Sequence, residues 1–295
     1  MKHFRFYLRQ RQKLVDKALQ RCLPSATDKP VAIHKAMRYS VFCGGKRVRP
    51  ILCLAACEAV SGHSARAMDS ACAMELIHTY SLIHDDLPCM DDDDLRRGRP
   101  TSHKIFGEGM AVLAGDALLT HAFELLAKNG AGLPTTQALQ VIKTIARAAD
   151  SRNLIGGQVG DLQAEGKKVS LAALRHIHLQ KTAALIEAAV EAGALAGKAS
   201  PKQCSALRTY ARNIGLAFQV ADDILDVLGD EKKMGKRVRK DSAKQKATYP
   251  GILGLEKSRD YLKRLTRSAL SSLRSFDAKA DPLRAMARFI ASRES

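Results

Sequence analysis

The sequence is poor in aromatic residues. It has no tryptophan, and aromatic residues make up only 5% of its 295 positions. Strands favour aromatic and β-branched side chains, whereas closely packed helices favour the small residues, above all alanine, that are abundant here. Few aromatic rings are present to form a stacking platform for nucleic-acid bases. The composition therefore favours a helical protein whose main function is not nucleic-acid binding.

The sequence also lacks the cysteine spacing of disulfide scaffolds and zinc sites. Its seven cysteines are an odd number, and no two of them form a Cys-x-x-Cys pair. This pattern predicts reduced, mostly buried thiols in a cytoplasmic protein. The cysteines are Cys22, Cys43, Cys53, Cys57, Cys72, Cys89 and Cys204.

No apolar run is long enough to predict a membrane span. The longest candidate, residues 183–196, is interrupted by Glu187 and Glu191. The first fourteen residues have no apolar segment of the kind found in secretory signals, and they are basic without the serine enrichment of a transit peptide. We therefore expect no helix that crosses a membrane.

Acidic residues are too few to balance the basic ones. Asp and Glu number 30 against 48 Lys and Arg, which gives a formal net charge of +18. The basic residues concentrate in segments 2–21 and 232–246 and towards the C-terminus. No recognition motif accompanies this charge, so a surface that attracts small polyanions explains it better than a nucleic-acid partner does.

Helical periodicity runs through the whole chain, and no alternating stretch is long enough to predict a strand. Ser170 and Ser200-Pro201 are typical helix starts, and Gly44-Gly45 is a typical stop. No linker divides the chain, so the sequence predicts one all-α domain over residues 1–295 with about ten or more helices. The expected helices cover residues 4–21, 31–43, 50–60, 65–87, 105–128, 134–149, 153–162, 171–197, 201–228 and 249 to the C-terminus.

Six aspartates lie within residues 84–98, directly after a predicted apolar helix. Asp85 and Asp86 fall near the C-terminus of that helix, where the backbone dipole is already negative. Pro88 interrupts the helix, so Asp91 can converge on the same point from another direction. Clustered carboxylates suit Mg²⁺, which takes one or two of them and completes its shell with water and phosphate oxygens.

A second acidic element, FQVADDILD, covers residues 218–226. Asp222 and Asp226 are four residues apart on a predicted helix, so their β-carbons lie about 5 to 6 Å apart, and the two like charges destabilise the helix unless a cation bridges them. Alone, this element would be explained best as a solvated acidic face. Two such elements in one helical chain are far more specific, and Arg96 and Arg97 add donors that fit phosphate.

In order and spacing, these motifs resemble those of the trans-isoprenyl diphosphate synthases, and most closely the short-chain farnesyl diphosphate synthases of bacteria. The resemblance covers residues 35–256. It implies the isoprenoid synthase fold, an all-α bundle around a central cavity, and a homodimer. The motifs are GGKRVRP at 44–50, the Asp run through RGRPT at 97–101, GGQ at 156–158, KT at 181–182, the element at 218–226 and GK at 235–236.

The resemblance implies a reaction between isoprenoid diphosphates. An allylic diphosphate, first dimethylallyl and then geranyl, ionises to a carbocation and pyrophosphate. The double bond of isopentenyl diphosphate attacks the cation, and the released pyrophosphate accepts the proton. Two or three Mg²⁺ ions between the acidic elements stabilise the leaving group. The expected product is farnesyl diphosphate.

The resemblance also implies roles for single residues. The metal ligands are Asp85, Asp86, Asp91, Asp222 and Asp226. The allylic diphosphate is expected at Arg96, Lys181, Lys236 and Lys246, and the oxygens facing the developing cation belong to Thr182 and Gln219. Isopentenyl diphosphate is expected at Lys46, Arg49, His78 and Arg97.

Product length is expected to depend on the helix that leads to Asp85. The growing chain extends along this helix, so a bulky side chain about one turn before Asp85 closes the pocket. Tyr80 and Ser81 occupy that region, and Tyr80 predicts that growth stops at C15. Similar geranylgeranyl synthases of plants tend to carry a smaller or unbranched side chain where Tyr80 lies, so a C20 product is the alternative.

Two other functions are less compatible with the sequence. A non-catalytic partner subunit of a prenyl synthase should have lost one acidic element, and both are intact. A terpene cyclase of the same fold would have no use for the residues that match the isopentenyl diphosphate site, Lys46, Arg49 and His78.

Overall fold

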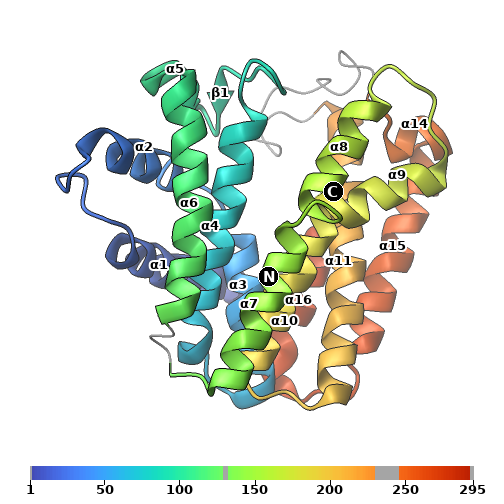
Figure 1. Cartoon of the computed structure of the whole chain (residues 1–295). Coiled ribbons are helices and arrows are strands. Elements are labelled where there is room, and N and C mark those ends of the chain that lie inside the picture. The colour runs from blue at the N-terminus through green and yellow to red at the C-terminus, as the bar shows by residue number, and fades with distance from the viewer. Residues whose placement is uncertain (1, 129–131, 230–245, 293–295) are drawn as a thin grey trace.

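Helices make up 77% of the computed structural model, which describes residues 2–128, 132–229 and 246–292 (Figure 1). The first part contains α1 (Lys2–Cys22), α2 (Val31–Val41), α3 (Val48–Ser61), α4 (Met68–Asp85), α5 (Ser102–Phe106), α6 (Glu108–Lys128) and α7 (Thr135–Ala149). The second part contains α8 (Leu154–Ala164), α9 (Leu171–His178), a π-helical segment (Leu179–Ala183), α10 (Ala184–Ala196), α11 (Pro201–Leu228), α14 (Tyr249–Leu253), α15 (Leu255–Ser272) and α16 (Asp281–Ala291). Short 3₁₀ turns cover Ala65–Ala67 and Ala278–Ala280. The predicted all-α class is confirmed.

Both helix starts predicted from serine N-cap residues are present in the structure. The hydroxyl of Ser200 accepts the backbone N–H of Gln203, and the Gln203 side chain accepts the N–H of Ser200, which forms a complete capping box before α11. The hydroxyl of Ser170 caps α9 by accepting the backbone N–H of Ala173. These hydrogen bonds satisfy backbone donors that the first turn of a helix leaves unpaired.

Four local features differ from the sequence prediction. The helix expected from 249 to the C-terminus is divided into α14, α15 and α16, first at Gly254, whose φ is 81°. The helix expected over 105–128 is divided at Gly107, whose φ of 83° ends α5 before α6 begins. The helix expected over 171–197 is interrupted by the π-helical segment. A hairpin was not predicted, yet β1 (Leu95–Arg96) pairs with β2 (Arg99–Pro100) through a turn in which Arg97 and Gly98 both have positive φ. Two-residue strands are too short to give an alternating pattern.

The core lies on both sides of the central pair α3 and α10. One apolar cluster joins this pair to α4, α6 and α7, and the other joins it to α11, α15 and α16. The backbones of α3 and α10 approach closely, because a Cβ on Gly193 would lie only 2.0 Å from the carbonyl oxygen of Cys53. Small residues at this crossing therefore fix the distance between the two halves of the bundle.

A buried ion pair anchors the segment between α2 and α3. Arg47 is 4% exposed, and its guanidinium lies 2.7 Å from Glu75 of α4, 2.8 Å from Asp16 of α1 and 2.7 Å from the carbonyl of Val41. Its φ of 50° is in the left-handed region. Arg47 thereby ties four helices together and sets the course of the Gly44–Lys46 segment that precedes it.

One of the described helices, α6, is long and apolar enough to cross a membrane by length and composition alone. This is weak evidence for a span, because core helices also pass such a test. In the structure α6 runs along α4 (Figure 1). Its outer side exposes Val112 and Leu113, with 39% and 56% of their surfaces accessible.

The two acidic elements lie at the same end of the bundle. In Figure 1, the hairpin that follows α4 and the helix α14 that follows α11 are both at the upper end. The first acidic element begins where α4 ends, and the second lies in the last turns of α11. Helices that are far apart in the sequence therefore bring the predicted metal ligands to one region.

Candidate active site

The first acidic element folds back at the C-terminal end of α4. Asp85 is the last residue of this helix, and the chain turns around Pro88. The backbone N–H of Asp91 then donates to the carbonyl of Asp85 at 2.8 Å, and that of Asp93 donates to Asp86 at 3.1 Å. Asp91 thus returns to the side of Asp85, as the interruption at Pro88 predicted.

Negative charge is concentrated at this turn. Burial raises the pKa of Asp85 to about 6, and the nearby Asp91 contributes to the rise. Burial also raises the pKa of Asp86, which is 3% exposed. Lys181 opposes the rise at Asp85, so this lysine from the π-helical segment acts on the first acidic element. A bound cation would favour the ionised form of both carboxyls.

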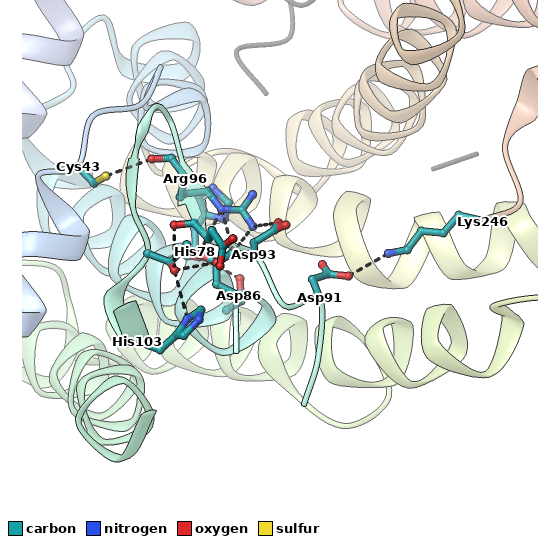
Figure 2. Close-up of polar contacts among 11 residues, drawn as sticks. Cys43, His78, Asp86, Asp91, Asp93, Arg96, His103 and Lys246 are labelled. Atoms are coloured by element: carbon teal, nitrogen blue, oxygen red, sulfur yellow. Dashed lines mark hydrogen bonds and ion pairs between the residues drawn. The ribbon is translucent and has the colours of Figure 1, made fainter. Parts of the chain in front are cut away.

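Arg96 reaches these acids from the hairpin. Its Nε lies 3.0 Å from Oδ1 of Asp86, and its Nη2 contacts Asp86 and lies 3.2 Å from Oδ2 of Asp93 (Figure 2). The carbonyl of Arg96 accepts a hydrogen bond from Sγ of Cys43 at 3.5 Å. A residue predicted to bind diphosphate and a residue predicted to bind metal are therefore in direct contact.

The next residue, Arg97, is directed to a different part of the structure. Its guanidinium donates to the carbonyl of Gly44 and occupies the space next to Gly45, where a Cβ would lie 2.4 to 2.9 Å from the guanidinium atoms. Gly44 and Gly45 have φ values of 96° and 126°, which side chains rarely tolerate. The glycine pair therefore leaves the space that Arg97 occupies. It does not end α2 as predicted, because that helix already ends at Val41.

Arg49 and His78 form a basic cluster with Arg97. Burial, aided by Arg97, lowers the pKa of Arg49 to about 10. The Nε atom of Arg49 is buried and has no acceptor within the described parts of the chain. Burial and the neighbouring guanidinium groups, that of Arg49 first, hold the pKa of His78 well below its usual value, so this imidazole is neutral at pH 7. Such a cluster suits an anion.

Lys46 was predicted to belong to the same set. It is exposed and lines a surface hollow of about 400 Å³ between α1 and α16, together with Arg5, Arg9 and Phe289. Of the four residues predicted to bind isopentenyl diphosphate, Arg49, His78 and Arg97 lie close enough to change one another's pKa. Lys46 instead borders this hollow, at the outer edge of the loop.

Two glycines enclose the π-helical segment that carries Lys181 and Thr182. A Cβ on Gly157 of α8 would lie 2.3 Å from the backbone nitrogen of Lys181, and a Cβ on Gly215 of α11 would lie 2.6 Å from Cβ of Ala183. The wider turn of a π-helix fits between its neighbours only because both lack a side chain here. This contact explains the second glycine of the GGQ motif.

Hydrogen bonds connect this segment to the second acidic element. Oγ1 of Thr182 donates to Oε1 of Gln219 at 3.2 Å, and Nε2 of Gln219 donates to Oδ1 of Asp223 at 3.1 Å. The other oxygen of Asp223 accepts the backbone N–H of Tyr249 at 2.9 Å. Asp223 therefore orients Gln219 and holds α14 against α11. We predicted no role for Asp223, although its position four residues after Gln219 was a signal.

Asp222 and Asp226 occupy the predicted positions one turn apart on α11, and Asp226 is only 4% exposed. Among the described residues, no three Asp, Glu, His or Cys side chains converge closely enough to hold a metal ion by themselves. Mg²⁺ needs no such cluster, because it takes one or two carboxylates and fills its shell with water and phosphate oxygens. The donor set therefore fits Mg²⁺ bound together with a diphosphate.

Asp161 of α8 joins two of the predicted lysines, a role that we did not predict. Its Oδ2 lies 2.6 Å from Nζ of Lys181 and 3.4 Å from Nζ of Lys246. Burial favours a higher pKa for Asp161, but the two lysines together hold it below the usual value. Lys246 also lies 3.3 Å from Asp91 (Figure 2), so it links the first acidic element to α8. The available signal was the spacing of four residues between Gly157 and Asp161.

The predicted chain-length residues lie on α4 before the first acidic element. Tyr80 is 6% exposed, and burial raises its pKa to about 12. Ser81 donates to the carbonyl of His78 at 2.9 Å within its own helix. The last predicted site residue, Lys236, lies outside the described residues.

The description of the family model that matches residues 30–283 is "Polyprenyl synthetase". This chain belongs to the polyprenyl synthetase family. It is a prenyltransferase of the trans-isoprenyl diphosphate synthase type, as the sequence motifs predicted. Members of the family act on isoprenoid diphosphates and generally use Mg²⁺.

Curated relatives are similar over almost the whole chain. The large subunit 1 of a heterodimeric geranylgeranyl pyrophosphate synthase, chloroplastic, from Arabidopsis thaliana is 50% identical, and the match covers 99% of this chain and 80% of the relative. The geranylgeranyl diphosphate synthase of Cyanophora paradoxa is 47% identical, with 98% and 96% covered. These names favour the C20 alternative over the predicted farnesyl product. Because several relatives are chloroplastic, the cytoplasmic location stays a prediction.

Solved structures share the fold. An FPP/GFPP synthase from Zymomonas mobilis superposes with a TM-score of 0.88 at 39% identity, covering 98% of this chain and 99% of that one. The geranylgeranyl pyrophosphate synthetase of Pyrococcus horikoshii gives a TM-score of 0.90 at 33% identity, with 99% of both chains covered. The architecture is the all-α isoprenoid synthase fold, as predicted.

Proposed function

We propose that this prenyltransferase adds isopentenyl diphosphate to dimethylallyl and then to geranyl diphosphate, and so forms farnesyl diphosphate. The observation that carries the proposal is the hairpin, which directs Arg96 to the acidic element and the neighbouring Arg97 to the basic cluster. Two diphosphates must meet in this reaction, one to ionise and one to stay intact. Adjoining sites of opposite character serve these two needs.

The allylic diphosphate is assigned to the acidic side. The carboxylates that would hold two or three Mg²⁺ ions are Asp85, Asp86, Asp91, Asp222 and Asp226. When bound, Mg²⁺ neutralises the charge that develops on the leaving diphosphate. Arg96, Lys181 and Lys246 now contact carboxylates of the site, and each exchanges that contact for a phosphate oxygen when substrate binds. Lys236 is assigned to the same group by its motif.

Ionisation breaks the bond between C1 and the diphosphate oxygen, and the electron pair leaves with pyrophosphate. The Thr182 hydroxyl donates a hydrogen bond to Oε1 of Gln219, so the lone pairs of the hydroxyl oxygen are left to stabilise the allylic cation. Asp223 fixes the amide of Gln219 in the matching orientation. The double bond of isopentenyl diphosphate then forms the new bond to C1, and its C2 proton passes to pyrophosphate.

Isopentenyl diphosphate is assigned to Arg49, His78 and Arg97, with Lys46 at the edge. Its own carbon–oxygen bond must not break. The carboxylate that acts on Arg49 and Arg97 is that of Glu75, and its pairing with Arg47 keeps it from recruiting Mg²⁺ to this cluster. The buried Nε of Arg49 supplies a donor for a phosphate oxygen. A diphosphate bound only by cationic donors is therefore held without activation.

Two product lengths have specific support. The names of the curated relatives favour one further elongation, to C20 geranylgeranyl diphosphate. The buried ring of Tyr80, one turn before the metal site, supports release at C15. Farnesyl diphosphate forms in either case, and the two differ in whether it is released or used as the next acceptor.

A homodimer is proposed through the outer side of α6. This helix exposes Val112 and Leu113, and a second copy would remove that apolar surface from water. The Arabidopsis relative is named as part of a heterodimer, so a different partner is the competing assembly. Light scattering should give a dimer for the purified chain and a monomer for Leu113→Glu, whereas a wild-type monomer would contradict the proposal.

A product assay tests the proposed function. Purified protein, Mg²⁺ and labelled isopentenyl diphosphate are combined with dimethylallyl, geranyl or farnesyl diphosphate, and products are separated by chain length. Asp222→Asn should lower turnover about 10²-fold or more, whereas Asp94→Asn should change it little, because Asp94 is exposed and pairs with Lys104. Turnover with farnesyl diphosphate indicates C20, and its absence indicates C15. No condensation with any acceptor would refute the function.

A further inference from the structure

The side chain of His84 fills a notch in the neighbouring helix α6. A Cβ on Gly115 of α6 would lie 2.1 Å from Nε2 of His84, 2.6 Å from Cδ2 and 2.9 Å from Cε1. The same Nε2 lies 3.0 Å from the carbonyl oxygen of Val112 and 3.9 Å from a carboxylate oxygen of Asp116. The imidazole is therefore lodged across the contact between α4 and α6, where only glycine leaves room for it.

The other side of this imidazole touches Tyr80. The two rings meet edge to face, with centroids 5.7 Å apart and planes at 81°. Tyr80 and His84 are four residues apart on α4, so they lie above one another on the same face. The Tyr80 ring is buried in the apolar core cluster, so packing sets its position, and the His84 ring is one of the groups that it contacts.

We propose that Gly115 and His84 are positioning residues for product length. Gly115 seats the imidazole, and the imidazole holds the Tyr80 ring across the path of the growing chain. This inference rests on the proposed function, in which Tyr80 limits elongation. It assigns the limit on product length to three contacting residues, Tyr80 and His84 on α4 and Gly115 on α6, instead of to Tyr80 alone.

This arrangement predicts an effect of Gly115→Ala that is opposite to the general effect of alanine in a helix. Alanine is normally the better helix former, but here its methyl group would occupy the space of the His84 ring. The imidazole then loses its seat and its contact with Val112, and the Tyr80 ring gains freedom to turn aside. Product one isoprene unit longer should increase at least about threefold as a share of the total.

Gly109 provides a matched control on the same helix. A Cβ at Gly109 meets no atom within 4 Å, so Gly109→Ala makes the same chemical change without a clash. It should leave the product distribution unchanged. A general effect of glycine replacement on α6 would appear in both variants, whereas an effect through His84 appears only at Gly115.

The test measures product lengths for wild type, Gly115→Ala, Gly109→Ala, Tyr80→Ala and the double variant Tyr80→Ala/Gly115→Ala. Dimethylallyl, geranyl and farnesyl diphosphate are compared as acceptors. Tyr80→Ala should lengthen the product. Adding Gly115→Ala should change the product length no further, because the Tyr80 ring that closes the pocket is already absent. Rates of each variant with dimethylallyl diphosphate should stay within a few-fold of the wild-type rate, because this shortest acceptor does not extend as far as the Tyr80 ring. A merely structural role would lower the rates with all acceptors equally.

Several outcomes would overturn the inference. Folded Gly115→Ala with the wild-type product distribution would do so, and so would further lengthening in the double variant. If Gly115→Ala does not fold, His84→Ala supplies the same comparison, with His84→Gln expected to restore shorter product because its amide can donate to Val112. Wild type that condenses no substrate would overturn the proposed function and the inference together, whereas active wild type with an unresponsive Gly115→Ala would overturn the inference alone.

Discussion

Replacing Asp85 with asparagine should stabilise the metal-free protein at neutral pH while it destroys prenyl transfer. Burial, with a contribution from Asp91, raises the pKa of Asp85 from 3.8 to about 6. The folded chain thus opposes ionisation of this carboxyl by about 2 pKa units, which corresponds to about 3 kcal/mol at 1.36 kcal/mol per unit. Asparagine has nearly the same shape and no charge, so Asp85→Asn removes this unfavourable term.

The effect should depend on pH in a defined direction. Because the pKa of Asp85 is higher in the folded state, that state binds more protons than the unfolded chain between about pH 4 and 6. The unfavourable term is therefore absent below about pH 4, grows as the pH rises and is complete above about pH 6. The variant should exceed wild type by up to about 3 kcal/mol at pH 7.5 and match it near pH 4, which corresponds to about 6 °C in Tm at pH 7.5.

The assay is urea unfolding followed by circular dichroism in EDTA at pH 7.5 and pH 4, with prenyl transfer measured separately in Mg²⁺. Asp94→Asn is the matched control, because that exposed carboxylate pairs with Lys104 and has no buried charge to remove. A variant no more stable than wild type at pH 7.5 would refute the reasoning. A gain that persists at pH 4 would refute it as well, because both proteins are then uncharged at this position.

The remaining predictions concern the supports of the site. Arg47→Met leaves Glu75 buried without its partner and should lower the free energy of unfolding by about 3 to 5 kcal/mol in urea titrations, while Arg47→Met/Glu75→Leu should recover most of it. Gly157→Ala pushes against the Lys181 backbone and should cost about 1 to 3 kcal/mol by the same measurement, with a lower kcat; unchanged kcat would exclude this contact as a support of catalysis. Asp223→Asn should lower kcat but leave the Mg²⁺ concentration for half-maximal activity unchanged, and a shift in that concentration would make Asp223 a metal ligand.

The sequence was informative where a residue determines its own surroundings. Ser200 begins α11 by bonding to a backbone group three residues away, and Pro88 interrupts α4 by its own ring and missing N–H. The return of Asp91 to Asp85 follows from that interruption. These features depend on residues close in the sequence, so a pattern of residue types is sufficient to predict them.

The π-helical segment could not be predicted from its own residues. Leu179–Ala183 contains neither glycine nor proline, and the glycines that make room for it, Gly157 and Gly215, lie on two other helices. The roles of Asp161 and Asp223 depend on contacts across helices in the same way. The hairpin was missed because its strands have only two residues each and Arg97 stands where the turn requires positive φ.

The π-helical segment also changes the rotational position of the residues that follow it in the continuous helix formed by α9 and α10. An α-helix advances by about 100° per residue, and a π turn is equivalent to one inserted residue. Everything from Ala184 to Ala196 is therefore rotated by one residue relative to α9. If the same residues formed a regular α-helix with none removed, everything after the segment would turn by about 100°, which would move Gly193 away from Cys53 and present another side chain to α3. The π turn that carries Lys181 and Thr182, which we propose to act in catalysis, is thus also what keeps Gly193 against α3 and the two halves of the bundle in register.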